Sequence, residues 1–181
     1  MVKERVVFFF SQHNMMPKHI LFYRDGVSES QYGMVYLEEL PLIRDGCRAA
    51  LTHPKVRLPL NTPLPKITLL VVGKRHHTRF PLSKNLPNNA IGDKKLDRSL
   101  QAGLLIDHTV VNAHQFSFYL QSHDSPQGTA RPGHYVVIIN ESEYGVKELQ
   151  EIVGGAKTEI LRFQKLMSLP QLDAQYLLHW I

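Results

Sequence analysis

Two short apolar runs, each ending in a polar cluster, constrain the fold of this chain more than any other feature. The first runs from His19 to Tyr23 and ends at Arg24-Asp25-Gly26; the second covers Ile67 to Val72 and ends at Gly73. Apolar runs of this length, bounded by turn residues, are typical of buried strands. Because open α/β sheets place chemistry past the ends of their strands, the two polar clusters are the first candidates for a site.

A helix is expected between these two runs. Ser28 and Gln31 fit a capping box, in which a hydroxyl and an amide satisfy the exposed N–H groups of a new helix. An apolar stripe at three- and four-residue steps follows, made of Tyr36, Leu40, Ile43, Cys47 and Ala50. Such a stripe must pack on a sheet. Pro41 interrupts it and predicts a kink, because proline lacks the N–H that a helix uses.

The rest of the chain continues the alternation of strands and helices. Strands are expected at Gln115–Leu120 and Tyr135–Ile139, a helix after Glu143, and a last short helix from Leu172 to Trp180. The run Val6–Phe10 belongs to the core, but its pattern fits a strand and a helix equally. This alternation predicts an α/β layered fold, and 181 residues allow one domain over positions 1–181.

Charge and cysteine content narrow the class of protein. The chain has 21 Lys and Arg against 16 Asp and Glu, a formal charge of +5, and ten His in addition, which favours a polyanionic partner. Cys47 is the only cysteine, so an internal disulfide is excluded, and a reducing compartment is expected, the cytoplasm or alternatively the nucleus. No run approaches the roughly 20 apolar residues of a membrane span, so no membrane partner is expected.

Asp25 is the first candidate for chemistry. An aspartate at the end of a strand can ligate Mg²⁺ through its oxygens, and a pair of carboxylates can hold two ions for phosphodiester hydrolysis. Asp-Gly is also common turn chemistry, in which the carboxylate binds nearby backbone N–H groups. The residues alone leave both interpretations open.

The segment Gly73-Lys74-Arg75-His76-His77-Thr78-Arg79 is the second candidate. It follows a buried strand and combines three fixed positive charges, two imidazoles and a hydroxyl, which suits binding to nucleic-acid phosphates. The alternative is a solvated basic loop. Zinc is disfavoured, because adjacent histidines diverge on a strand and no third ligand has suitable spacing.

A third candidate follows the expected strand at Gln115–Leu120. Ser122-His123 and the turn-rich segment from Gln127 to Tyr135 offer small, hydroxyl and basic residues for phosphate contacts. A serine–histidine nucleophile is disfavoured, because no nucleophile-elbow pattern is present. His134 precedes a buried strand and is interpreted as a structural histidine.

Taken together, these segments resemble the Piwi domain of eukaryotic Argonaute proteins. The resemblance covers residues from about 5 to 153 well and the remainder loosely. It rests on four blocks that occur in the family's order: Ile20-Leu21-Phe22-Tyr23-Arg24-Asp25-Gly26-Val27-Ser28-Glu29, Val71-Val72-Gly73-Lys74-Arg75-His76-His77-Thr78-Arg79, Phe116-Ser117-Phe118-Tyr119-Leu120, and the turn from His123 to Tyr135. It implies an RNase H-like fold, a mixed sheet flanked by helices, that cuts an RNA target paired to a small guide RNA.

The resemblance also assigns roles to individual residues. Asp25 matches the family's second catalytic aspartate, which binds Mg²⁺ or Mn²⁺. Eight residues match basic or phosphate-contacting positions of the nucleic-acid channel: Lys74, Arg75, His123, Gln127, Thr129, Arg131, Arg162 and Lys165. His179 is the nearest counterpart of the fourth catalytic position, although its spacing from Pro170 is two residues longer than the family pattern.

Other parts of the family site are missing from these 181 residues. The first catalytic aspartate, the mobile catalytic glutamate and the leading strands of the fold have no counterpart, so the chain is expected to be a Piwi domain truncated at its N-terminal strands. Two-metal hydrolysis needs several carboxylates, and Asp25 with an imidazole cannot supply them. We therefore expect that the chain does not hold Mg²⁺ tightly and does not cleave RNA alone. An open apolar sheet edge is also expected.

The leading hypothesis is a guide-RNA-binding Piwi module of an RNA-silencing protein, with guide RNA, target RNA and silencing proteins as partners. One alternative is a Mg²⁺-dependent endoribonuclease, if a longer product supplies the absent carboxylates. The other is a degenerate fragment that acts as a protein-interaction module.

Overall fold

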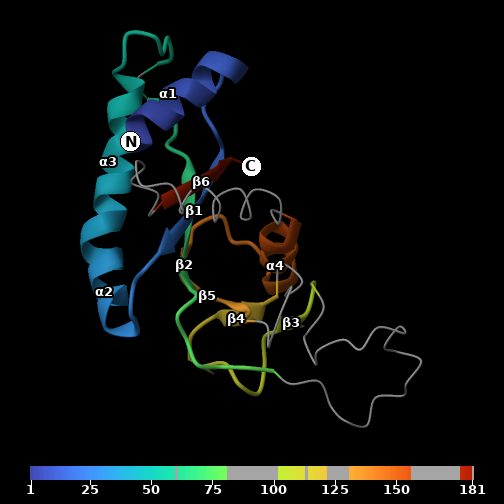
Figure 1. Cartoon of the computed structure of the whole chain (residues 1–181). Coiled ribbons are helices and arrows are strands. Elements are labelled where there is room, and N and C mark those ends of the chain that lie inside the picture. Colours follow the sequence, from blue (N-terminus) through green and yellow to red (C-terminus); the bar gives the residue numbers. More distant parts are fainter. Residues whose placement is uncertain (60, 81–101, 113, 122–130, 156–175, 181) are drawn as a thin grey trace, which may run out of the picture. The chain divides into compact units, whose positions relative to one another are not determined.

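The computed structural model describes residues 1–59, 61–80, 102–112, 114–121, 131–155 and 176–180. Along them, four strands in succession, β2 to β5, separate the helices of the N-terminal part from the last helix, and the described strands form one mixed sheet of six strands in the order β3-β4-β5-β2-β1-β6 (Figure 1). The chain divides into two compact units. Unit 1 comprises Met1–Val71, Val137–Tyr144 and Asp173–Ile181, and unit 2 comprises Val72–Val136 and Gly145–Leu172. Strands β2 and β5 each begin in one unit and end in the other.

The two strands predicted from the apolar runs are present. They are β1 (His19–Asp25) and β2 (Lys66–Gly73), which are buried along most of their lengths. The Lys66 N–H donates to the Lys18 carbonyl at 2.9 Å, so both strands start side by side and run parallel. Strand β5 (Gly133–Asn140) runs antiparallel to β2, because the Glu141 N–H bonds to the Ile67 carbonyl at 3.0 Å.

Helix α1 (Val2–His13) resolves the ambiguous run near the N-terminus in favour of a helix. Val6, Val7 and Phe10 are buried on its inner side, while Phe8 is 59% exposed. The helix packs on α3 (Leu40–Leu51), as Figure 1 shows. Gly46 permits this approach, because a Cβ at that position would lie 2.8 Å from the Cβ of Val2. Burial between two helices thus selects the helix over a strand.

The segment from Glu29 to the start of α3 is helical but irregular. A 3₁₀ turn, η1 (Glu29–Gln31), begins at the predicted cap, where Gln31 Oε1 accepts the Ser28 N–H at 3.1 Å. It continues as α2 (Tyr32–Met34) and a π-helical turn, η2 (Val35–Glu39), whose wider spacing is seen in the Leu40 N–H bonding to the Val35 carbonyl. The irregularity predicted at Pro41 takes the form of this wider turn directly before it, which suits a proline because its ring cannot donate an N–H to the preceding turn.

The expected helix at the C-terminus is wrong for the described residues Tyr176–Trp180, which form strand β6. It pairs antiparallel with β1, from Ile20↔Trp180 to Arg24↔Tyr176. The edge strand on this side of the sheet is therefore β6 and not β1. The physical reason is that β1 offers a row of unpaired backbone groups on this side, and satisfying them outweighs the weak helix propensity of a five-residue segment.

In unit 2 a short meander is followed by a helix. Strand β3 (Leu105–Ile106) pairs antiparallel with β4 (Ser117–Leu120), and β4 pairs antiparallel with the start of β5. Phe118 stacks on Tyr135 with ring centroids 5.2 Å apart, and both rings are buried. Helix α4 (Val146–Gly155) follows, as predicted. None of the helices in the described ranges is long and apolar enough to cross a bilayer.

Candidate nucleic-acid interface

Asp25 is the last residue of β1, at the strand end where the sequence predicts it. Its Oδ1 accepts the N–H of Gly26 at 2.8 Å, and Gly26 has a φ of 77°, a conformation that glycine adopts without strain. The strand therefore ends in a tight turn that the carboxylate itself helps to close. This is the turn chemistry that the residues alone leave open as an alternative to metal binding.

Arg24 fixes the same turn from the other side. Its guanidinium donates to both carboxylate oxygens of Glu39, at 2.9 to 3.1 Å, and to the backbone oxygen of Asp25 at 2.5 Å. The Arg24 and Glu39 side chains are only 11% and 16% exposed. Glu39 ends the π-helical turn, so the irregular helix places the carboxylate that orients Arg24. The arrangement is an internal ion pair that holds the strand end.

The described residues do not fit a divalent ion at Asp25. Across the described ranges no three His, Cys, Asp or Glu residues are grouped so that they could hold a metal. Glu39, the acid held close by, is occupied by Arg24. The backbone register pairs His179 with Leu21, four residues from Asp25, about 13 Å along a strand. The structure thus does not bring His179 and Asp25 together.

The second predicted site, the basic loop (residues 74–79), lies in unit 2 at the end of β2. His76 is turned inward: its Nε2 donates to the Pro132 carbonyl at 2.7 Å, which requires the proton on that nitrogen. Arg75 and His77, on either side, are exposed. Inward and outward side chains therefore alternate, which presents the exposed cation and imidazole to solvent.

The hydrogen bond from His76 to Pro132 also brings a third basic residue to the loop. Arg131, immediately before Pro132, is exposed, and the backbone oxygen of His134 lies 3.7 Å from where a Cβ on Gly73 would be. The backbone at Arg131 and the backbone at Arg75 thus belong to adjoining segments. Two of the residues that the sequence predicts as nucleic-acid contacts, Arg75 and Arg131, therefore lie on neighbouring segments of the backbone.

Arg79 has a different role from the other cations of the basic loop. Its guanidinium donates to the carbonyl oxygens of His76 and Thr78, at 3.1 and 2.8 Å. These bonds fold the side chain back onto its own loop. Arg79 therefore stabilises the backbone of the loop. It is not among the residues that the resemblance matches to nucleic-acid contacts.

Five of the predicted nucleic-acid contacts lie outside the described residues: His123, Gln127, Thr129, Arg162 and Lys165. Their roles stay predictions.

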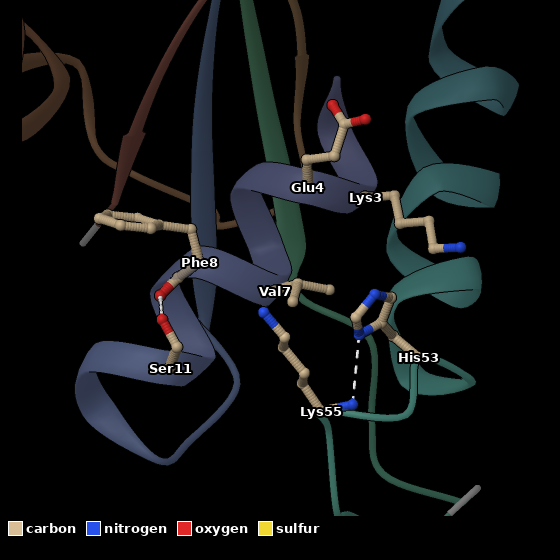
Figure 2. A pocket seen from close by; sticks show the side chains of 7 residues that line it. All are labelled: Lys3, Glu4, Val7, Phe8, Ser11, His53 and Lys55. Carbon is tan, nitrogen blue, oxygen red and sulfur yellow. Dashed lines mark hydrogen bonds between the residues drawn. The ribbon is translucent and has the colours of Figure 1, made fainter.

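One further feature, a hollow of about 440 Å³ on unit 1, has no signal in the sequence. It is lined by Lys3, Glu4, Val7, Phe8, Ser11, His53 and Lys55. Figure 2 shows Lys55 and His53 reaching toward Val7 from the segment after α3. The lining residues on α1 and those after α3 are about fifty positions apart in the sequence, so only the packing of α1 on α3 brings the two groups together. The hollow contains none of the residues that the sequence predicts for catalysis or nucleic-acid binding.

Comparison with known proteins decides the family. The Piwi domain family model matches residues 1–161. The chain belongs to the Piwi domain family. This Piwi domain is 33% identical over 170 residues to protein argonaute 5 of Arabidopsis thaliana, a match that covers 93% of the chain and 16% of the relative.

Solved structures agree with the family. The C-terminal lobe of a budding yeast Argonaute aligns with a TM-score of 0.72 and 26% identity, over 83% of this chain and 30% of the other. Kluyveromyces polysporus Argonaute, solved with a guide RNA, gives a TM-score of 0.70 and 27% identity, over 83% of this chain and 18% of the other. The RNase H-like mixed α/β fold expected from the sequence is thereby confirmed. The Piwi domain spans about a sixth of the length of the plant relative.

Proposed function

We propose that this Piwi domain holds a guide RNA by its sugar-phosphate backbone, as part of an RNA-silencing protein, and that it does not cut RNA with its own residues. One observation carries the proposal: the hydrogen bond from His76 to Pro132 joins two basic segments, those of Arg75 and Arg131. Support comes from the Kluyveromyces polysporus Argonaute, whose structure holds a guide RNA.

Arginine and lysine side chains on a fixed backbone suit phosphates, because phosphates are the feature that every nucleotide shares. Binding of this kind has little sequence preference. It depends strongly on salt, since each phosphate contact releases counterions from the nucleic acid. The formal charge of +5 acts in the same direction by attracting polyanions at long range.

The surroundings of Asp25 argue against RNA cleavage by the residues of this domain. Its carboxylate accepts the Gly26 N–H, and Glu39 is paired with Arg24. Hydrolysis by two metal ions needs several carboxylates around a pair of ions about 4 Å apart. Incubation with labelled RNA and Mg²⁺ should therefore leave the RNA intact, and a discrete cleavage product that EDTA abolishes would favour the endoribonuclease alternative.

The proposal is tested by fluorescence anisotropy with a labelled single-stranded RNA of about 16 nucleotides at a series of KCl concentrations. The double variant K74E/R75E removes two proposed contacts. The matched control K3E/K55E makes the same change of net charge on the hollow in unit 1, which contains no residue of the basic loop.

For the wild type, the logarithm of the binding constant should fall linearly with the logarithm of the salt concentration. K74E/R75E should weaken binding more than tenfold and reduce that slope by about 1.4, or two contacts of about 0.7 each. K3E/K55E should keep the wild-type slope. Equal losses in both variants would show that only net charge matters. Absence of RNA binding, with protein capture that survives nuclease, would favour the protein-interaction alternative.

A further inference from the structure

Tyr119, on β4, is the centre of an aromatic cluster in unit 2. Its ring stacks on the imidazole of His134 with centroids 4.3 Å apart and planes 13° apart. The rings of His76 and Phe80 each meet it edge-on, both with centroids at 5.3 Å. Tyr119 is only 8% exposed, so these neighbours enclose it almost completely.

Three of the contacts come from one stretch of chain, the basic loop and the residue after it. His76, Thr78 and Phe80 all reach Tyr119, with Thr78 Oγ1 at 3.4 Å from the tyrosine hydroxyl. Every second residue of this stretch therefore faces the tyrosine. Arg75 and His77, which flank His76, are exposed.

The fourth contact, with His134, connects Tyr119 to the basic segment that contains Arg131. His134 follows Pro132 by two residues, and Pro132 accepts the hydrogen bond from His76. Tyr119 thus touches both the basic loop and the strand that begins beside Arg131. The Tyr119 side chain thus adds a second link between the two basic segments, beside the hydrogen bond from His76 to Pro132.

A loop held in one conformation before binding loses less entropy when the ligand arrives, and so binds more tightly than a mobile loop with the same charges. Aromatic contacts are suited to this task, because edge-on and offset-stacked rings prefer definite geometries. The cluster supplies no charge of its own to a phosphate. Its contribution to binding would be through the cations that it orients.

We propose that Tyr119 is a positioning residue for nucleic-acid binding: it fixes the basic loop so that Lys74 and Arg75 are presented beside Arg131. This inference rests on the proposed function and deepens it, since the sequence assigned no role to Tyr119. The tyrosine hydroxyl makes only the longer contact with Thr78, so the aromatic ring, and not the hydroxyl, does the positioning.

The test uses three variants of the full chain. Tyr119→Leu removes the ring, Tyr119→Phe keeps it, and Phe118→Leu is the matched control. Phe118 is the neighbouring residue of β4, points to the opposite face as alternation on a strand requires, and stacks on Tyr135. It is fully buried, so the control loses an aromatic stack without touching the basic loop.

The salt dependence of binding to the labelled RNA is measured first. Tyr119→Leu should weaken binding about tenfold and lower the slope by about 0.7 to 1.4, corresponding to one or two lost phosphate contacts. Tyr119→Phe and Phe118→Leu should keep the wild-type slope. A wild-type slope in Tyr119→Leu, or an equal loss in Phe118→Leu, would overturn the proposal.

A second measurement, without RNA, separates this inference from the proposed function. Amide hydrogen exchange of residues 74–80 should be faster in Tyr119→Leu than in the wild type, and unchanged in Phe118→Leu. If the wild type fails to bind RNA but this difference is found, the positioning role holds and the proposed ligand is wrong. If Tyr119→Leu does not fold, Phe80→Leu, which removes one of the edge-on ring contacts to Tyr119, should show a smaller acceleration over the same residues, and unchanged exchange there would contradict the proposal.

Discussion

The ends of β1 and β2 are both polar, yet their side chains are used in opposite ways. At the end of β1, the Asp25 carboxylate accepts the Gly26 N–H of the following turn, and Arg24 forms an ion pair with Glu39. At the end of β2, the inward residues of the basic loop bind Tyr119 and Pro132, which leaves Arg75 and His77 outside. The charged side chains at the β1 end are satisfied internally, whereas the β2 end leaves Arg75 exposed to solvent.

The comparison teaches that residue type at a strand end is not enough to define a site. A carboxylate or guanidinium that is bound by its neighbours stabilises the fold, and an exposed cation on a braced loop is placed to meet a ligand. Arg24 is an example of the first case, since it is paired with Glu39, and Arg75 is an example of the second, since it is exposed on the basic loop. We therefore expect changes at the β1 end to affect stability, and changes at the β2 end to affect binding.

The largest effect should come from breaking the ion pair at the β1 end. Arg24→Ala leaves Glu39 without a partner in a site where both side chains are more than four-fifths buried. We expect a loss of roughly 2–3 kcal/mol in the free energy of unfolding, measured by urea denaturation, somewhat below the cost for a fully buried pair. The slope of RNA binding against salt should not change.

Asp45→Asn is the control for that experiment. It breaks the pair between Asp45 and Arg48, whose side chains are 64% and 61% exposed. Such surface pairs contribute little, and a loss below about 0.5 kcal/mol is expected. Equal losses in the two variants would show that the β1 end is no more dependent on its charges than the surface is.

The thiol of Cys47 sharpens the comparison by reporting whether the helices of unit 1 stay packed. Burial raises the pKa of this thiol to about 11 from an ordinary value of 9.0. At pH 8 the thiolate fraction should be about 100-fold smaller than for an exposed cysteine, so a thiol reagent should label the folded chain slowly and the urea-unfolded chain fast. Fast labelling of the folded chain would show that α1 and α3 separate readily.

The raised pKa of Cys47 also predicts how stability depends on pH. Since the folded-state value is the higher one, the neutral thiol favours the folded state below pH 9, and this contribution is lost as the pH rises toward 11. The loss should be about 2–3 kcal/mol at most, because each pH unit between the folded and unfolded pKa values corresponds to about 1.4 kcal/mol. Urea denaturation at pH 8 and pH 10.5 measures it, and an unchanged midpoint would contradict the expectation.

A smaller effect is expected at the turn that follows Asp25. Gly26 has a φ of 77°, and a Cβ there would meet no atom within 4 Å, so Gly26→Ala strains only the backbone. We expect a loss of about 1–2 kcal/mol on thermal unfolding. Gly26→Asn should recover part of it, because asparagine tolerates this conformation better. No loss in Gly26→Ala would show that the turn at the β1 end is not fixed.

The smallest effect should follow from Asp25→Asn. The side-chain oxygen of asparagine can still accept the Gly26 N–H, so stability and RNA affinity should both stay close to those of the wild type. Calorimetric titration with Mn²⁺ should give no difference between the two chains. Loss of a Mn²⁺ signal in the variant would show that Asp25 is a metal ligand after all, and the contrast between the two strand ends would fail.

Much of the fold could be predicted from local patterns. The runs at His19–Tyr23 and Ile67–Val72 are apolar enough to be strands in any context, and both are. The run Val6–Phe10 could not be assigned, because the outcome depends on the close approach of α1 to Gly46. The strand at Tyr176–Trp180 has the local pattern of a helix, and its pairing with β1 is a long-range contact that no local pattern encodes.

The candidate site follows the same division. The positions of Asp25 and the basic loop at strand ends were predictable from the boundaries of the apolar runs. The pairing of Arg24 with Glu39 was not, because it depends on the irregular turn between them. The contacts of Tyr119 were not predictable for a related reason: one comes from the register of β4 against β5, which places His134 opposite Tyr119, and the others come from the distant basic loop and the residue after it.

The number of residues in the π-helical turn Val35–Glu39 sets how the helix before this turn is rotated relative to α3. Removing one residue there would restore ordinary α-helical spacing and rotate the preceding part of the helix by about 100° relative to α3. Either Glu39 would then lose Arg24, or the stripe of Leu40, Ile43 and Cys47 would leave the core. A single-residue deletion in this segment would thus reorient all the residues of the helix that precede it, whereas the same deletion in an exposed loop would shift only its neighbours.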